Sequence, residues 1–418
     1  MELAAILMLF LVTCSLLVSK NNISPSFLLS GSFFSVYFLQ SIFAPDMYSS
    51  TTATLIIFLI SAFFILGEIT GTLILAENSY RLINKEAVIG RNNLNSDQYK
   101  TRVAVIINCL GILALIGTYK YIVALGIFDS GDISSSILRI GAIREKIFTD
   151  EIYVSFFDRI GFLLSYTGVV LSIFYWYFFG WRWWLLIPSA AVLGLGMAQA
   201  GRLGLIVISI QWAVVLYIKT RMTGDNRLRI RIFGIGSLIF GIFIFGQLFR
   251  EGFQDLSMES ISNIIQSLRG YLFGGVSAFA FYIDNIFDSN SLSYGKYSLS
   301  SLFAVLGIHE QDPGVYDFYA SISEYGETTN IYTAYRSFID DFSILGTIAL
   351  YGLAGLIISS ITRLFLLGHN YSLAIIVPLF SWLICTPLLS LTYFNSFLLS
   401  IIAPFIILRL AEFRLSHD

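Results

Sequence analysis

The residues whose types could do chemistry gather in one polar segment, NIYTAYRSFIDDFSILG at 330–346, which runs directly into an apolar stretch. Arg336 lies near its centre, and the carboxylates Asp340 and Asp341 follow. A guanidinium keeps its charge at every physiological pH and binds phosphate oxygens through two parallel hydrogen bonds. A charge beside or inside a membrane is costly, and it is retained mainly where it is paired or functional. The segment therefore predicts a site for a diphosphate at a membrane surface.

Other arginines could contribute to the same site. Arg202 lies in AQAGRLGL, between small residues that let another chain approach closely. Arg250 and Arg269 flank the start of a long acidic loop that ends near Arg336. Each of these side chains could instead pair with a neighbouring carboxylate or extend to lipid headgroups. Both readings stay open from the sequence.

A general base that deprotonates a sugar hydroxyl would come from the same acidic loop. The candidates are Asp284, His309, Glu324, Glu327, Asp340 and Asp341. The loop is also rich in tyrosines, whose rings stack against sugars but are equally at home in the aromatic belt of a membrane protein. The sequence does not choose among the bases.

The elements that must position these residues are apolar helices. The chain of 418 residues is 56% hydrophobic and 12% charged, and its mean hydropathy is +0.77. A helix needs ~20 mostly apolar residues to cross a bilayer. Eleven candidate spans are predicted, at 3–18, 26–44, 53–75, 103–119, 160–179, 183–199, 203–218, 232–249, 343–360, 372–389 and 394–409. We expect an all-α polytopic membrane protein with about 11 transmembrane helices (11–14 at most) and a single integral domain over 1–418.

Few metal-binding residue types are present. The three cysteines all fall inside predicted spans, and the three histidines are scattered. Zinc sites need such residues at close, regular spacing. We therefore expect neither a metal nor a cofactor.

The basic residues predict the orientation. The loops 78–102 and 219–231 are rich in Lys and Arg and belong in the cytoplasm. The N-terminus then lies outside and the C-terminus inside, with a smaller exterior loop at 120–158 and a large one at 250–341. The large loop should be partly helical, and its apolar stretch at 273–287, interrupted by Asp284, should lie at or dip into the membrane surface.

Taken together, the chain resembles the Wzy-type polymerases of bacterial O-antigen and oligosaccharide repeat units. The resemblance rests on the layout of many spans with a large late exterior loop, on AGRLGL at 200–205, and on TNIYTAYRSFIDDFSILG at 329–346. The last segment is similar to the family's Asn-hydrophobic-Tyr-Thr stretch, followed by Asp-Phe and a helix-starting glycine. Eleven spans lie at the low end for that family.

The resemblance implies a metal-independent glycosyltransferase of the GT-C type. Its donor and acceptor would be undecaprenyl-diphosphate-linked oligosaccharides at the periplasmic face of the bacterial inner membrane. The implied catalytic residues are Arg202, Arg336 and Asp341, and the expected substrate-binding residues are Arg250, Arg269, His309, Asn330 and Tyr332. The implied partners are membrane lipids and a co-polymerase that sets chain length, and we expect no nucleic-acid partner.

Two other functions compete with this one. An O-antigen ligase shares the layout and hands its glycan to lipid A-core with help from an exterior histidine, a role that His309 keeps open. The Asn-Tyr-Thr segment favours polymerase. A flippase for lipid-linked sugar would usually show paired repeat halves and charges within several spans, whereas here the charges concentrate in one loop.

Overall fold

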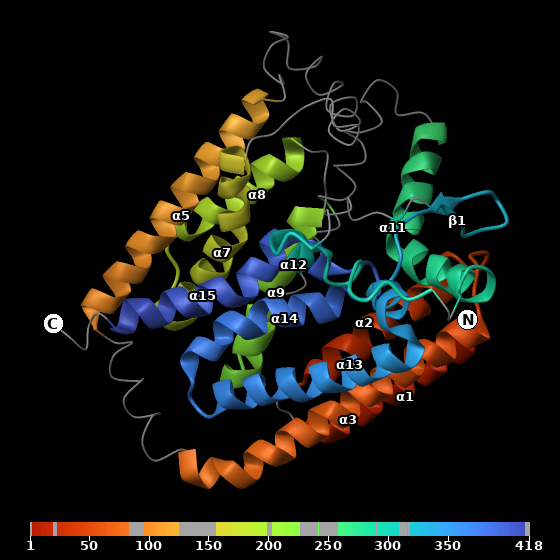
Figure 1. Cartoon of the computed structure of the whole chain (residues 1–418), viewed down its shortest axis with the longest axis horizontal. Helices are drawn as coiled ribbons and strands as arrows, with labels where there is room; N and C mark the ends of the chain where they lie inside the picture. Colours follow the sequence, from red (N-terminus) through yellow and green to blue (C-terminus); the bar gives the residue numbers. More distant parts are fainter. Residues whose placement is uncertain are drawn as a thin grey trace. The chain divides into compact units, whose positions relative to one another are not determined.

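The computed structural model of the protein describes residues 2–19, 23–82, 96–124, 156–198, 203–225, 241, 258–288, 291–308, 316 and 318–413. Most of these residues are helical (Figure 1). Among the described residues, six helices are long and apolar enough to cross a membrane: α2 (Pro25–Phe43), α3 (Thr51–Leu82), α5 (Asp97–Ala124), α9 (Leu203–Thr223), α13 (Ala334–Leu366) and α15 (Asn395–Phe413).

Shorter apolar stretches, at Glu2–Val18, Leu163–Phe179, Trp183–Gly196 and Asn370–Cys385, account for the remaining described spans. They lie in α1 (Glu2–Ser19), α7 (Phe156–Phe179), η1 with α8 (Trp183–Leu186 and Ile187–Ala198), and η2 with α14 (Asn370–Ser372 and Leu373–Cys385). The predicted span at 232–249 lies outside the described residues. The chain is thus a helical multi-pass membrane protein, and the number of crossings stays a prediction.

The chain divides into two compact units by the contacts of its elements, and the single integral domain over 1–418 stays a prediction. One unit comprises Met1–Glu86, Gln266–His369 and Leu379–Asn395, and the other comprises Ala87–Ile265, Asn370–Pro378 and Ser396–Asp418. The predicted site segment at 330–346 falls in the first unit. We call this the site unit.

The site unit is organised around the close pairing of α3 with α13, beside which α1 and α2 lie (Figure 1). Glycines let the two backbones touch. A Cβ on Gly67 would lie 1.9 Å from the carbonyl oxygen of Gly352, and one on Gly355 would lie 2.2 Å from the carbonyl oxygen of Phe64. Small residues at such spacing favour tight helix packing in membranes, where apolar area alone gives no driving force between helices.

Helix α13 is broken near its start. Ser343 has φ +65° and ψ 174°, and its Oγ accepts a hydrogen bond from Gly346 N at 3.4 Å, as an N-cap residue does. The break separates a short helix that carries Arg336 from the apolar helix that follows. The predicted start of the span at 343 coincides with this break.

The part of the predicted large loop that the structure describes is ordered around α11 (Met258–Asn285), a single continuous helix. After it come a turn at 293–296, a short helix α12 (Ser300–Val305), and a small hairpin of β1 (Ala320–Ser321) and β2 (Thr328–Thr329). Within this hairpin Ala320 pairs with Thr329 and Ser321 with Thr328. A short helix η3 (Leu391–Tyr393) precedes α15. The hairpin is the one departure from all-α structure among the described residues.

The second unit packs α5 against α7 and α8 (Figure 1). Its aromatic cluster joins several elements: the Tyr371 ring lies 6.4 Å from that of Tyr99 and 6.1 Å from that of Phe174, and the Arg409 guanidinium sits 4.9 Å from the Tyr371 centroid. Cation–π and ring contacts of this kind fix helix ends.

Candidate functional site

Arg336 is positioned by backbone hydrogen bonds that anchor the start of α13. Thr333 N donates to Gly275 O on α11 at 3.3 Å, and Ala334 N donates to Thr386 O at 2.9 Å. These bonds fix the first turn of the helix between α11 and the end of α14. The Arg336 side chain therefore emerges at a defined place inside the site unit, where the residue is only 6% exposed.

Three tyrosine rings surround the Arg336 guanidinium. Its carbon lies 3.6 Å from the ring centroid of Tyr316, 3.8 Å from that of Tyr332 and 4.5 Å from that of Tyr282. The rings come from the loop before the hairpin, the segment before α13, and α11. Stacking on a desolvated guanidinium contributes about 2 kcal/mol in favourable cases. We call these four residues, together with Asp340, the Arg336 cage.

Asp340 completes the cage. Its Oδ2 accepts a hydrogen bond from Arg336 Nε at 3.4 Å, one helical turn away, and its Oδ1 accepts one from the Tyr282 hydroxyl. Burial raises the pKa of the Tyr282 and Tyr316 phenols, and the neighbouring Asp340 charge raises it further. Burial also raises the pKa of Tyr332, although the nearby Arg336 charge opposes that shift. The three phenols are therefore neutral at physiological pH and can donate hydrogen bonds.

One nitrogen of the Arg336 guanidinium lacks a hydrogen-bond acceptor among the described residues. Among the residues that the structure describes, none accepts a hydrogen bond from Arg336 Nη1, although this atom is buried. A buried donor without a partner costs ~1–3 kcal/mol, so such groups usually mark a place for water, an ion or a ligand. One carboxylate at 3.4 Å is a weak partner for a buried charge. The cage is thus chemically suited to receive an anionic oxygen.

Asp341 has partners that differ from those expected of a catalytic carboxylate. It is fully buried, and its side chain accepts hydrogen bonds from Tyr297 N at 3.1 Å, Ser298 N at 2.6 Å and Ser298 Oγ at 2.7 Å. A carboxylate saturated in this way holds a loop and offers no free oxygen. The geometry favours an anchoring role for Asp341 over the predicted catalytic one.

Arg269 forms its ion pairs with residues outside the cage. Its Nη2 lies 2.5 Å from Asp46 Oδ2 and 3.9 Å from Glu327 Oε2, in the manner of a structural ion pair. It precedes Tyr282 by thirteen residues on α11, which corresponds to roughly 20 Å along the helix axis. The structure therefore does not bring Arg269 together with Arg336.

The other predicted site residues divide into two groups. Tyr332 belongs to the cage, and its hydroxyl donates to Phe318 O at 3.1 Å. Asn330 is half-buried just after β2, two residues from Tyr332. Arg202, Arg250 and His309 lie outside the described residues.

The sequence analysis missed two residues of the cage. Tyr282 and Tyr316 were only members of a tyrosine-rich loop, with no spacing that linked them to Arg336. Asp340 was one of several candidate bases. Contacts across 54 positions of sequence from Tyr282 to Arg336 leave no local pattern, so packing alone reveals them.

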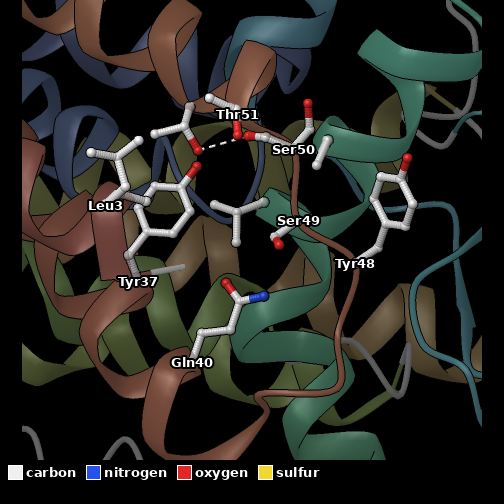
Figure 2. A pocket seen from close by; sticks show the side chains of 11 residues that line it. Leu3, Tyr37, Gln40, Tyr48, Ser49, Ser50 and Thr51 are labelled. Atoms are coloured by element: carbon white, nitrogen blue, oxygen red, sulfur yellow. Dashed lines mark hydrogen bonds between the residues drawn. The ribbon is translucent and has the colours of Figure 1, made fainter.

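A partly polar cavity of about 60 Å³ is lined by the ends of α1 to α3, by the segment 48–50 and by Val276 and Ala280 of α11 (Figure 2). Gln40 points into it, and its Nε2 donates to Ser277 Oγ at 2.9 Å. Next to it, Asp284 accepts hydrogen bonds from Ser50 Oγ at 2.7 Å and Tyr48 OH at 3.0 Å. A cavity of this size holds about two water molecules.

Glu68 is a buried carboxylate inside α3 that lies apart from the cage. Its Oε2 accepts a hydrogen bond from Ser26 N at 2.7 Å, at the first turn of α2. An acceptor at a helix N-terminus satisfies a donor that has no partner within the helix. Glu68 therefore ties α3 to α2.

Comparisons with known proteins do not identify a relative of the chain. No family model, curated protein or solved structure matches it significantly. The residues that indicate a function are therefore those of the cage and of the 329–346 segment.

Proposed function

We propose that the protein polymerises undecaprenyl-diphosphate-linked oligosaccharide repeat units, as a GT-C-type glycosyltransferase of the Wzy kind. The observation that carries the proposal is the Arg336 cage: a buried guanidinium whose Nη1 has no acceptor among the described residues, held by Asp340 and three neutral phenols. Three residues of the cage, Arg336, Tyr332 and Asp340, lie within the segment on which the family resemblance rests.

The proposed reaction transfers the growing glycan to a new repeat unit. A hydroxyl oxygen of the acceptor sugar attacks the anomeric carbon of the donor glycan, and the bond from that carbon to the diphosphate oxygen breaks. The electron pair stays on the departing undecaprenyl diphosphate, and a carboxylate base takes the hydroxyl proton. Arg336 stabilises the charge that develops on the diphosphate, an effect worth ~3–4 kcal/mol for a well-placed donor.

Asp340 serves in this scheme as a positioning residue. It lies 3.4 Å from the guanidinium that would hold the leaving group, so it lies on the leaving-group side of the reaction. A base must instead reach the attacking hydroxyl. Asp340 therefore fixes the orientation of Arg336, and the base is another acidic residue of the 250–341 segment.

The proposed location is the bacterial inner membrane, with the cage at its periplasmic face and the C-terminus in the cytoplasm. The distribution of Lys and Arg supports this orientation, because the loops 78–102 and 219–231 are the most basic of the chain. Undecaprenyl-linked repeat units would reach the cage from the outer leaflet. A ligase that moves the same glycan to lipid A-core stays the alternative, and polymer analysis separates the two.

Arg336→Lys and Arg336→Ala test the proposal in cells that lack the chromosomal gene. Lysine keeps the charge but loses the fork that fits two phosphate oxygens. We expect Arg336→Ala to lower polymer formation about 100–1000-fold and Arg336→Lys at least about tenfold. Polymer is read on gels of surface polysaccharide, and protein level on immunoblots of membranes.

Arg221→Lys is the matched control. Arg221 is an exposed arginine in the last turn of α9, and its guanidinium lies 5.5 Å from the Tyr217 centroid. The substitution makes the same chemical change outside the cage and keeps the charge of a basic loop. Polymer of normal length and amount in Arg336→Ala would show that the cage takes no part in the reaction.

A further inference from the structure

A strained turn lies directly beside the helix that carries Arg336. Lys296 N donates to Ser293 O at 3.2 Å, and the two central residues, Tyr294 and Gly295, have φ of +49° and +97°. Positive φ at both central positions defines a type I′ turn. Gly295 suits its position, because a Cβ there would lie 2.7 Å from the Phe303 ring.

Tyr294 is the unexpected residue in this turn. Asn, Asp or Gly usually occupies its position, since a larger side chain in the left-handed region is strained. Such a residue costs ~1–3 kcal/mol and persists where the surroundings impose it. Tyr294 is nevertheless 73% exposed, so burial of its ring does not offset the strain.

The turn is fixed to the short first part of α13. Ser293 N donates to Asp340 O at 2.9 Å, and Tyr294 N donates to Asp341 O at 3.2 Å. The buried Asp341 carboxylate then holds the following residues through Ser298 and Tyr297. Two backbone hydrogen bonds to α13 therefore hold the turn that presents the Tyr294 ring, and the Asp341 carboxylate fixes the residues that follow the turn.

The turn also contacts the cage. The Tyr297 ring lies 5.4 Å from the ring of Tyr316, which covers the Arg336 guanidinium. Asp341, whose carbonyl binds Tyr294 N, follows Arg336 by five residues, or about 7.5 Å of helix. The backbone of Tyr294 is thus fixed to the same short helix that carries Arg336.

We infer that the exposed Tyr294 ring is a stacking platform for a sugar ring of the lipid-linked oligosaccharide. This inference rests on the proposed function, because it assigns the sugar next to the diphosphate that Arg336 holds. An aromatic face packs well against the C–H face of a pyranose, and a rigid ring on a fixed turn loses little entropy on binding. The strained backbone of Tyr294 is then explained, because the turn holds the ring where a sugar can stack on it.

Binding measurements on the purified full-length protein in lipid nanodiscs test this platform. The two probes are undecaprenyl diphosphate and the lipid-linked oligosaccharide extracted from cells that lack the gene. We expect Tyr294→Gly and Tyr294→Leu to weaken binding of the oligosaccharide probe about tenfold and to leave binding of undecaprenyl diphosphate unchanged. Tyr294→Trp keeps an aromatic face and should bind both probes as the wild type does.

Stability measurements separate this role from a structural one. Glycine relieves the positive φ, so Tyr294→Gly should unfold at the same temperature as the wild type or at a higher one while it binds the oligosaccharide probe less well. Leucine keeps an apolar anchor for the membrane surface, so wild-type binding in Tyr294→Leu would show that the ring is only a lipid anchor and would overturn the inference.

The platform and the proposed function can fail separately. If the wild type binds both probes and Arg336→Lys weakens both, while the Tyr294 variants bind normally, only the platform is wrong. If the wild type binds neither probe, the proposed function falls, and the platform falls with it.

Discussion

Two adjacent carboxylates have different roles because a helix turns by about 100° per residue. Asp340 faces Arg336 and Tyr282, whereas Asp341 faces Tyr297 and Ser298, just after the turn at 293–296. The sequence identified the pair but assigned the catalytic role to Asp341. The assignment needed the partners of each side chain, and the partners of Asp341 lie more than forty positions earlier in the chain.

Replacing Asp341 should mainly reduce stability. Asp341→Ala leaves the N–H groups of Tyr297 and Ser298 without their acceptor, which should cost about 2–4 kcal/mol. The thermal unfolding of the purified protein in detergent measures this loss. Asp340→Asn is the paired control: it keeps the shape of the side chain, so it should lower polymer formation while unfolding close to the wild-type temperature. An Asp341→Ala protein as stable as the wild type would contradict the anchoring role.

Helices were the elements that the sequence predicted best. Long apolar runs give spans directly, and a span predicted to begin at 343 begins at the break in α13. The hairpin of β1 and β2 was not predicted, because strands of two residues carry no alternating pattern. The continuity of α11 was not predicted either. Its first half is polar and its second half is apolar, a composition that suggests two segments in different environments.

The packing of α3 against α13 can be tested by a substitution in their contact. Gly67→Val places a branched side chain where the Gly352 carbonyl oxygen would lie 1.9 Å from the new Cβ, so the helices must separate. We expect a strong loss of folded protein, at least about 3 kcal/mol, seen as aggregation during size-exclusion chromatography in detergent.

Gly31→Ala is the control for this substitution. No atom among the described residues lies within 4 Å of a Cβ at Gly31 on α2, so alanine should be tolerated and should raise helix stability by ~0.5–1 kcal/mol. Normal folding of Gly67→Val would show that the helices are not in contact through their backbones.

For the whole molecule, composition alone gave the class of protein. A mean hydropathy of +0.77 with only 12% charged residues is typical of membrane proteins, and the described part of the chain holds six apolar helices long enough to cross a membrane. The division into two units was not predicted, because it depends on which helices share a core. Hydropathy says where a chain crosses the membrane but not which crossings pack together.

Orientation is the property of the whole chain that reporter fusions measure. A fluorescent protein that folds only in the cytoplasm should be bright when fused after Asp418. The reverse is expected for alkaline phosphatase, which needs an oxidising compartment and should be active only when inserted within the 291–308 segment. Active phosphatase at the C-terminus would invert the topology and place the cage in the cytoplasm.

The central claim is that this chain joins repeat units, and a single measurement tests it most directly. Surface polysaccharide from cells that lack the gene is run on a gel beside the lipid-linked intermediates of the same cells. The proposed function predicts that the ladder of long chains collapses to a single attached repeat unit, which expression of the wild-type gene reverses. A ladder of normal length would contradict it, and so would loss of attached glycan with long lipid-linked polymer accumulating, the pattern of a ligase.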